Sequence, residues 1–242
     1  MSSCRNSSEN GNLIETKHGW KEYIVNQQGD SVMIIYNLEK EKTSEVTFKD
    51  GLYDGIGYNY YSNGNIKNEI HYKKGRKEGI TKWFYENGKP YRFTMYKYGR
   101  KNGIRKIFYK DGNLKAEIPY KDDEPQAGLK EYRKDGTLFT DQPKIYFREI
   151  DMLAYEDKYY LEVYLKPKRK KVEFYRIKKI DGEEFEIGLP EGTKKGVARI
   201  TYLIRPGDVL MQKLKIKVVT TTKHGNPLVL YKTYNLAVEN RF

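Results

Sequence analysis

Along much of the chain, short runs of apolar and aromatic residues alternate with polar ones, at the period of two that is typical of β-strands. Between residues 48 and 139 these runs recur with a fixed step. The step is marked by Gly64, Gly88, Gly112 and Gly136, which follow one another at intervals of 24 residues. A constant interval of this length predicts a repeat array in which each unit is one supersecondary motif.

Each repeat unit is predicted to be a β-hairpin. Asn-Gly or Asp-Gly, as at Asn63-Gly64, lies between runs rich in aromatic and branched residues, which predicts a tight turn there. A second, wider turn is expected at Gly51, Gly75 and Gly99. Two turns in 24 residues leave two strands of about seven to nine residues, close to the usual strand length. Apolar side chains fall on both faces of residues 80–85, so part of the aromatic surface is expected to stay exposed.

Tyrosines follow the same step as the glycines. Tyr72 and Tyr96 each begin a Tyr-x-x-Gly-x-x-x-Gly sequence, and shorter Tyr-x-x-Gly turns begin at Tyr61, Tyr85 and Tyr109. In these positions the chain resembles MORN repeats, in the variant form found in YwqK-like bacterial antitoxin proteins. The resemblance implies an elongated hairpin sheet used for binding, with antitoxin or membrane-associated roles in some members, and it implies no catalysis by the repeats.

The resemblance covers about residues 48–141 and departs at both ends. Phe48 replaces the first loop tyrosine, and Tyr132 lies four residues before Gly136 instead of three. Before the array, residues 13–36 are predicted to form two strands about a turn at Gly29, as a degenerate first repeat. Gly29 precedes Gly64 by 35 residues, so residues 37–47 are expected to hold an irregular extra half unit.

Beyond Gln142-Pro143 the 24-residue step is lost, and seven strands are predicted at 144–150, 159–165, 172–177, 185–189, 197–204, 210–220 and 228–238. Seven short strands predict an immunoglobulin-like β-sandwich, and an extended sheet packed on the repeat array would give the same pattern. The expected fold is therefore all-β: a flexible tether (1–12), an elongated antiparallel β-hairpin repeat sheet (13–141) and a β-sandwich domain (142–242).

The chain is strongly basic, with a net charge of +13 and a pI near 9.4. This charge favours acidic partners, which include proteins, anionic lipids, cell-wall polymers and nucleic acids. Hydrophobic residues make up 38% of the chain, enough for a core, and no window approaches the 18 or so apolar residues of a membrane span.

The single cysteine, Cys4, excludes an intrachain disulfide. Ser2-Ser3-Cys4 followed by a polar segment resembles the end of a bacterial lipoprotein signal, although the apolar segment of such a signal is absent. Two interpretations stay open. Cys4 is a lipidation candidate that would anchor the protein in the cell envelope, or it is a free cysteine in a polar leader.

Candidates for catalysis are few. His18, His71 and His224 are interpreted as structural or exposed, because a metal site needs several ligands at defined spacing. Gly-x-x-x-Gly sequences begin at Gly51, Gly75 and Gly99, but none is followed by the Lys-Ser or Lys-Thr of a phosphate-binding loop. The sequence therefore predicts no enzyme, no cofactor and no metal.

The sharpest functional prediction is a cationic strip. It comprises Lys73, Lys74, Arg76, Lys77, Lys97, Arg100, Lys101, Arg105 and Lys106. Because the loops that carry these residues recur with the repeat, they should lie on one edge of the sheet, about 10 Å apart, and could bind an anionic partner. The alternative is that edge lysines keep the sheet soluble and prevent strand addition.

A second basic run, residues 166–171, is interpreted as a charged hairpin loop, with surface or nucleic-acid binding as the alternative. Nucleic acid is disfavoured as a partner, because the chain has no RRM, OB, KH or helix-turn-helix signature.

These observations predict a binding or scaffold protein that recognises another macromolecule, most simply a protein, through its repeat sheet. In one form it is a lipid-anchored envelope protein. The alternatives are a cytoplasmic YwqK-like antitoxin that neutralises a toxin by direct binding, and a protein that binds anionic phospholipid surfaces.

Overall fold

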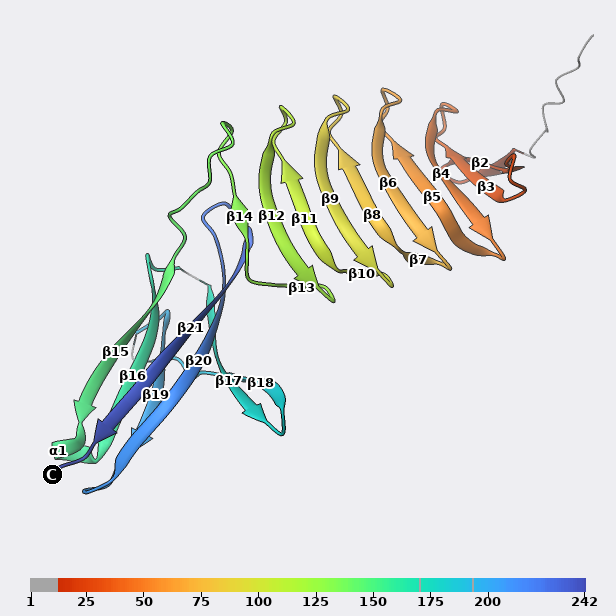
Figure 1. Cartoon of the computed structure of the whole chain (residues 1–242). Helices are drawn as coiled ribbons and strands as arrows, with labels where there is room; N and C mark the ends of the chain where they lie inside the picture. The colour runs from red at the N-terminus through yellow and green to blue at the C-terminus, as the bar shows by residue number, and fades with distance from the viewer. Residues whose placement is uncertain (1–12, 170, 193) are drawn as a thin grey trace, which may run out of the picture. The chain divides into compact units, whose positions relative to one another are not determined.

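The computed structural model describes residues 13–169, 171–192 and 194–242, which form mainly antiparallel β-strands (Figure 1). The helix α1 (Leu153–Glu156) is a single turn. Two compact units divide the described residues. The first contains residues 13–124 and 130–138, and the second contains 125–129 and 139–242. The prediction of an all-β fold is confirmed.

The strands of the first unit lie in one sheet in which most neighbours in sequence are neighbours in space (Figure 1). The strands of this sheet are β1 (Ile14–Thr16), β2 (Gly19–Val25), β3 (Ser31–Tyr36), β4 (Lys42–Lys49), β5 (Leu52–Tyr60), β6 (Ile66–Lys73), β7 (Arg76–Lys77), β8 (Gly79–Phe84), β9 (Pro90–Lys97), β10 (Arg100–Lys101), β11 (Gly103–Phe108), β12 (Leu114–Lys121), β13 (Glu124–Pro125) and β14 (Lys130–Glu131). This repeat sheet is a single layer within the described part of the unit.

The hairpins close differently at the two ends of the strands, and the expected turn types are reversed. At the Asn-Gly end, Gly64 N donates to Tyr61 O at 2.9 Å and Tyr61 N donates to Asn65 O at 2.8 Å. Gly64 has a φ of 81°, whereas Asn63 does not have a positive φ. This is a type I turn followed by a left-handed glycine, which makes a longer loop than the predicted two-residue turn.

The other end of the hairpins, predicted to be the wider turn, closes in two residues. Lys73 lies opposite Arg76, and the intervening Lys74 and Gly75 have φ values of 48° and 76°. Positive φ at both central residues defines a type I′ turn, whose twist matches that of the strands. The same pairs of positive φ values recur at 50–51, 98–99 and 122–123.

The 24-residue step extends further toward the N-terminus than predicted. Lys40 N donates to Asn37 O at 3.1 Å, and Asn37 N donates to Glu41 O at 2.9 Å, as in the later turns. Lys40, 24 residues before Gly64, adopts the left-handed conformation with a φ of 62°. The predicted extra half unit is present, but the prediction that it is irregular is wrong, because a lysine occupies the glycine position of a regular turn and β4 follows it.

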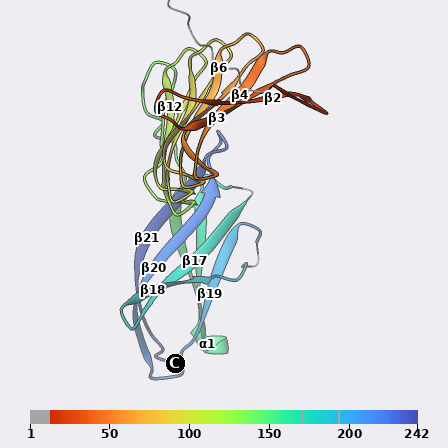
Figure 2. The ribbon, with the colours of Figure 1, turned by 90° about the vertical axis from the view of Figure 1, so that its right-hand side faces the viewer.

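The second unit contains the seven predicted strands. They are β15 (Lys144–Met152), β16 (Lys158–Lys166), β17 (Val172–Ile180), β18 (Glu183–Gly188), β19 (Val197–Leu203), β20 (Val209–Thr221) and β21 (Pro227–Glu239). They form a three-stranded sheet, β15-β16-β19, and a four-stranded sheet, β18-β17-β20-β21. Figure 2 shows β21, β20 and β17 in the order of the second sheet.

The core of the second unit lies between its two sheets. Leu161 and Val163 of one sheet pack in one cluster with Leu214 and Ile216 of the other, and all four are fully buried. The unit is therefore a β-sandwich, as predicted. The order of its strands differs from that of an immunoglobulin constant domain, because the fourth strand, β18, pairs with β17 and not with the sheet of the first strand.

Candidate binding surface

Cross-strand register divides the side chains of the repeat sheet between two faces. One face, which we call the packed face, has the buried side chains Asn68, Ile70, Thr81, Thr94, Ala116 and Ile118. They are buried in a single layer because long side chains lie across them. Lys77 Nζ is 5.3 Å from the ring centre of Tyr96, and the Arg105 guanidinium is 4.8 Å from that of Tyr120.

The opposite face, which we call the open face, has an exposed apolar row. The row consists of Ile80, Met95 and Ile104, on strands β8, β9 and β11. Ile80 and Met95 are cross-strand partners, and they are 41% and 43% exposed. Ile104 is 43% exposed. Side chains of this size are usually covered in a soluble domain, so a contiguous exposed row marks a candidate contact surface.

Other side chains of the open face contact one another. The ring of Phe93 lies 6.2 Å from that of Phe84 and 5.0 Å from that of Phe108. Glu69 accepts hydrogen bonds from Lys82 at 2.9 Å and from His71 at 2.8 Å. Burial alone would raise the pKa of Glu69, but these two hydrogen bonds outweigh it and lower the pKa below its ordinary value. These contacts cover part of the open face, whereas the side chains of the apolar row stay exposed.

The basic loops of the sequence analysis lie side by side at the type I′ end of the strands. Gly99 N donates to Lys77 O at 2.9 Å, which links the turn after β9 to the turn after β6. Five members of the cationic strip are exposed here, namely Lys73, Lys74, Arg76, Lys97 and Arg100. We call these five residues the basic edge. None of them forms an ion pair within 4.0 Å with any residue that the structure describes.

Like charges face each other in the basic edge. Lys73 is the cross-strand partner of Arg76, and Lys97 is the partner of Arg100. Like charges directly opposite each other destabilise a strand pair. At the equivalent place in the next unit, residues 121–124 read Lys-Asp-Asp-Glu, so the array also contains a loop of mixed charge.

The carboxylates nearest the basic edge bind backbone amides. Asp54 Oδ2 accepts from Lys74 N at 3.0 Å, and Glu78 Oε2 accepts from Tyr98 N at 2.7 Å. These bonds fix the two turns in place while the ammonium and guanidinium groups of the edge project without an acidic hydrogen-bond partner. The edge is therefore a preorganised cluster of cations beside the apolar row.

The other four residues of the predicted strip lie elsewhere. Lys77, Lys101 and Arg105 belong to the packed face, where they cover tyrosine rings, and Arg105 also bonds Thr94 Oγ1 at 3.3 Å. Lys106 lies on the open face, 3.7 Å from Glu117. The sequence placed all nine residues together because they are close along the chain, whereas alternation along a strand sends them to different faces.

The remaining sequence candidates do not form a catalytic arrangement among the described residues. His71 binds Glu69, and His224 packs on Phe139 with ring centres 4.5 Å apart. Cys4 lies outside the described residues. No three His, Cys, Asp or Glu side chains of the described chain gather where they could hold a metal ion. Among the same residues, no helix is long and apolar enough to span a membrane.

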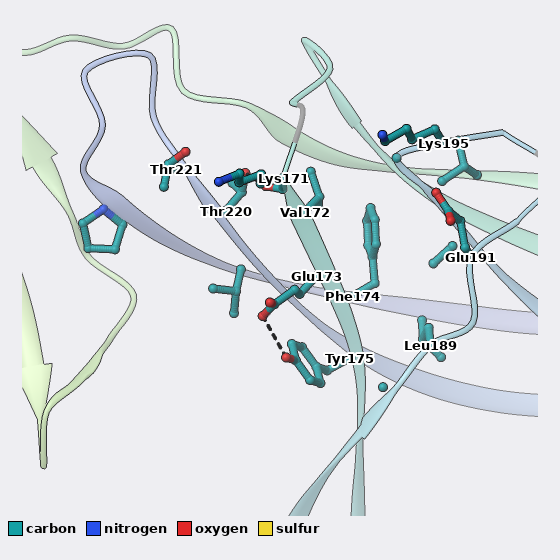
Figure 3. A pocket seen from close by; sticks show the side chains of 16 residues that line it. Lys171, Val172, Glu173, Phe174, Tyr175, Leu189, Glu191, Lys195, Thr220 and Thr221 are labelled. Carbon is teal, nitrogen blue, oxygen red and sulfur yellow. Dashed lines mark hydrogen bonds between the residues drawn. The ribbon is translucent and has the colours of Figure 1, made fainter.

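A pocket of about 790 Å³ opens in the second unit, where the strand ends of both sheets meet (Figure 3). Val172, Phe174 and Leu189 give it an apolar wall. Figure 3 labels Glu173, Glu191 and Lys195 among the lining side chains, and the Glu173 carboxylate accepts from the Tyr175 hydroxyl at 2.9 Å. The pocket thus carries charges of both signs. No residue of the predicted cationic strip lines it.

Sequence reasoning missed the exposure of the apolar row and the role of the acids beneath the basic edge. Both had a signal in the repeat, since an isoleucine follows Gly55, Gly79 and Gly103, and Asp54 and Glu78 are 24 residues apart. What the period could not show was which face each position occupies.

Comparison with protein families agrees with this geometry. Residues 53–74, 77–97 and 101–122 match the family model of the MORN repeat variant, so the resemblance predicted from the sequence is confirmed over these three segments. MORN repeats are generally associated with binding and scaffolding and are typically not catalytic. No curated protein matches the chain.

Proposed function

We propose that this chain, which carries three MORN repeat variant units, is a scaffold protein that binds an acidic protein through the basic edge and the apolar row. One observation carries the proposal: two adjacent like-charge pairs, Lys73 with Arg76 and Lys97 with Arg100, lie without acidic partners beside exposed Ile80 and Met95. An apolar centre with a charged border is the usual anatomy of a protein interface.

The energetics support a partner that supplies negative charge. Each cross-strand pair of like charges costs stability. Acidic side chains of a partner would relieve this repulsion and would also accelerate encounter with it. Isolated lysines could prevent strand addition without facing another cation, so protection of the edge accounts for the paired geometry less well.

The decisive variant is Arg76→Glu with Arg100→Glu in the full-length protein. It converts both like-charge pairs into opposite-charge pairs, so the fold should become slightly more stable while binding of the partner weakens. The matched control is Lys110→Glu with Lys134→Glu, two exposed residues in turns at the other end of the strands. Position 110 tolerates glutamate, because Glu86 occupies the same place 24 residues earlier.

The partner would be captured from the native cell, purified and titrated against the three proteins. We expect the edge variant to bind at least tenfold more weakly, about 1.4 kcal/mol, and the control to bind like the wild type. Wild-type affinity should fall as salt rises. Equal affinity of all three proteins, or a partner that is not acidic, would refute the proposal. An antitoxin that occludes an acidic toxin is one form of this function, and a toxin would then be the captured protein.

A second candidate, binding to an anionic membrane, is favoured by Tyr98. This side chain is 70% exposed at the tip of its turn, between Lys97 and Arg100, and has a φ of 52° that bulky residues rarely adopt. Tyrosine is enriched where proteins meet lipid headgroups, and nearby cations attract anionic lipids.

A lipid anchor at Cys4, which we also propose for an envelope location, would place the chain on such a surface.

Sedimentation with vesicles distinguishes the two candidates. If a membrane is the partner, the wild type should co-sediment with vesicles containing phosphatidylserine but not with phosphatidylcholine vesicles, and Tyr98→Ser should weaken that binding. If an acidic protein is the partner, Tyr98→Ser should leave its affinity nearly unchanged. Mass spectrometry of the native protein tests the anchor, since a diacylglyceryl adduct on Cys4 supports it and an unmodified thiol rejects it.

A further inference from the structure

The outer face of the sheet β15-β16-β19 has an unusual arrangement of cations. Register places Arg148 and Arg199 on either side of Glu162, and two residues further along the strands it places Tyr146 beside Tyr164. The next row pairs Lys144 with Lys166. We call these seven residues the arginine face. It lies opposite the core face of the same sheet.

Glu162 organises the two arginines. Its carboxylate is 1% exposed and accepts from Arg199 Nη2 at 2.6 Å and from Arg148 Nε at 3.0 Å. A buried carboxylate needs such partners, but one carboxylate neutralises only one of two guanidinium groups. The Arg148 side chain remains 49% exposed, so part of its guanidinium can still donate to a ligand.

The tyrosines hold the lysines above the sheet. Lys166 Nζ lies 5.1 Å from the ring centre of Tyr146 and 5.6 Å from that of Tyr164. Lys232 Nζ lies 5.5 Å from the same Tyr146 ring, and the two tyrosine rings stack on each other at 6.0 Å. The ring faces are therefore already occupied by cations and by each other. They position charge and leave little room for a stacked nucleic-acid base.

Charge on this face is unbalanced. Lys144 and Lys166 are directly opposite each other, and no described residue forms an ion pair with either within 4.0 Å. With two arginines and two lysines against Glu162, the arginine face carries a net charge of +3 (4 − 1). The chain continues from Lys166 into Lys168, Arg169 and Lys171, so the second basic run of the sequence extends the same charge.

We propose that the arginine face binds a linear polyanion of closely spaced phosphates that carries no bases. Arg148 and Arg199 are separated by two strand spacings, about 10 Å, and the lysine row lies four residues away, about 14 Å. A polymer with several phosphates in that distance would meet both rows at once, and guanidinium groups match phosphate oxygens well. This surface shares no residue with the basic edge.

Binding would be measured with long-chain inorganic polyphosphate and with oligo(dT) of equal charge, by fluorescence anisotropy at several salt concentrations. All proteins are full-length and carry Arg76→Glu and Arg100→Glu, so that any contribution of the basic edge is reduced and is the same in every protein compared. The test variant adds Lys144→Gln and Lys166→Gln. Its matched control adds Lys178→Gln and Lys179→Gln, which remove the same charge from exposed positions on β17.

We expect the parent to bind polyphosphate more tightly than oligo(dT), the test variant to bind polyphosphate at least tenfold more weakly with a shallower salt dependence, and the control to bind like the parent. An equal loss of polyphosphate affinity in the test variant and its control, or no loss in either, would show that the arginine face is not the binding site. Tighter binding of oligo(dT) would overturn the ligand class. A second variant, Arg148→Gln, tests the face without touching the lysines and should also weaken binding, while thermal unfolding shows that each protein is folded.

Discussion

The repeat sheet and the sandwich are both antiparallel β-structures, but their stability has different sources. In the sandwich, two sheets bury one another, and Leu161 and Leu214 are completely covered. In the repeat sheet, each unit is tied to the next. The hydroxyls of Tyr61, Tyr85 and Tyr109 each donate to a backbone carbonyl 23 residues ahead, at 2.7–2.9 Å. Stability is thus concentrated in one core in the sandwich and distributed over equal steps in the array.

This difference decides where each part can contact a partner. The sandwich uses the inner faces of both its sheets for its core, so only outer faces and edges remain available. The repeat sheet has no second layer among its described residues, and it can present side chains on a face, as in the apolar row, as well as at its ends. Four experiments test the comparison, in order of decreasing expected effect.

The largest effect is expected from Leu161→Ala. Leu161 is 0% exposed between the two sheets, and removing such a side chain typically costs about 2–5 kcal/mol of unfolding free energy. Ile70→Ala in the packed face is the comparison, and it should cost less because that site can collapse from its open side. Urea denaturation measures both. An equal loss at the two positions would contradict the idea of one concentrated core.

The next effect depends on pH. Burial alone would raise the pKa of Glu162, but hydrogen bonds from Arg199 and Arg148 outweigh it and lower the pKa below its ordinary 4.5. A carboxyl whose pKa is lower in the folded state stabilises the fold above its unfolded pKa, and this contribution is lost as pH falls through the folded value. Glu162→Gln should therefore cost about 1.5–3 kcal/mol at neutral pH.

Acid should abolish the difference in the free energy of unfolding between the wild type and Glu162→Gln. Urea titrations from pH 7 down to pH 3 would follow it. The pKa of the Glu69 carboxyl is also lowered, so Glu69→Gln provides the corresponding measurement in the repeat sheet. A difference for Glu162→Gln that stays constant over this range would show that the carboxylate is not held in its charged form by the arginines.

A smaller effect is expected from Tyr85→Phe, which removes only the hydroxyl that donates to Phe108 O at 2.9 Å. One such hydrogen bond is worth about 0.5–1.5 kcal/mol. Tyr61→Phe and Tyr109→Phe should cost the same, because the tie is repeated. Tyr91→Phe is the control. The Tyr91 ring packs on Tyr85 with ring centres 5.1 Å apart, but Tyr91 is 39% exposed, so removing its hydroxyl should cost little stability. Unequal losses among the three ties would show that the steps are not equivalent.

The smallest effect is a stabilisation by Lys40→Gly. Lys40 has a φ of 62°, a conformation that costs about 1 kcal/mol for a residue with a Cβ. Glycine removes this strain but gains freedom in the unfolded chain, so the net gain should be below about 1 kcal/mol. Thermal unfolding would detect it. A loss of stability would mean that the lysine side chain, whose Nζ lies 4.9 Å from the Trp20 ring centre, contributes more than the strain costs.

Much of the fold could be predicted from the sequence because its signals are local. Glycines at fixed intervals and alternating apolar residues gave the hairpin repeats and the seven later strands. The turn at Asn37 was missed because Lys40 replaces the expected glycine, and tertiary context holds it in place. The turn types were exchanged because Asn-Gly is compatible with both a two-residue turn and a type I turn with a left-handed glycine.

The surfaces were harder to predict than the elements. The sequence identified Lys73 and Arg100 as members of one cluster, which requires only the period. It could not separate Arg105 from Lys106, which are adjacent in sequence and lie on opposite faces. The arginine face requires the register of β15, β16 and β19, and Arg199 is 37 residues from Glu162, so no local pattern reveals that pair.

The forward tie from each tyrosine to the following unit makes the junctions interchangeable. If 24 residues were removed or inserted, each tyrosine hydroxyl would still donate to a backbone carbonyl of the unit that follows it. The length of the array is therefore a quantity that duplication or deletion of a gene segment can adjust, which lets the reach of the molecule change while every joint keeps its chemistry.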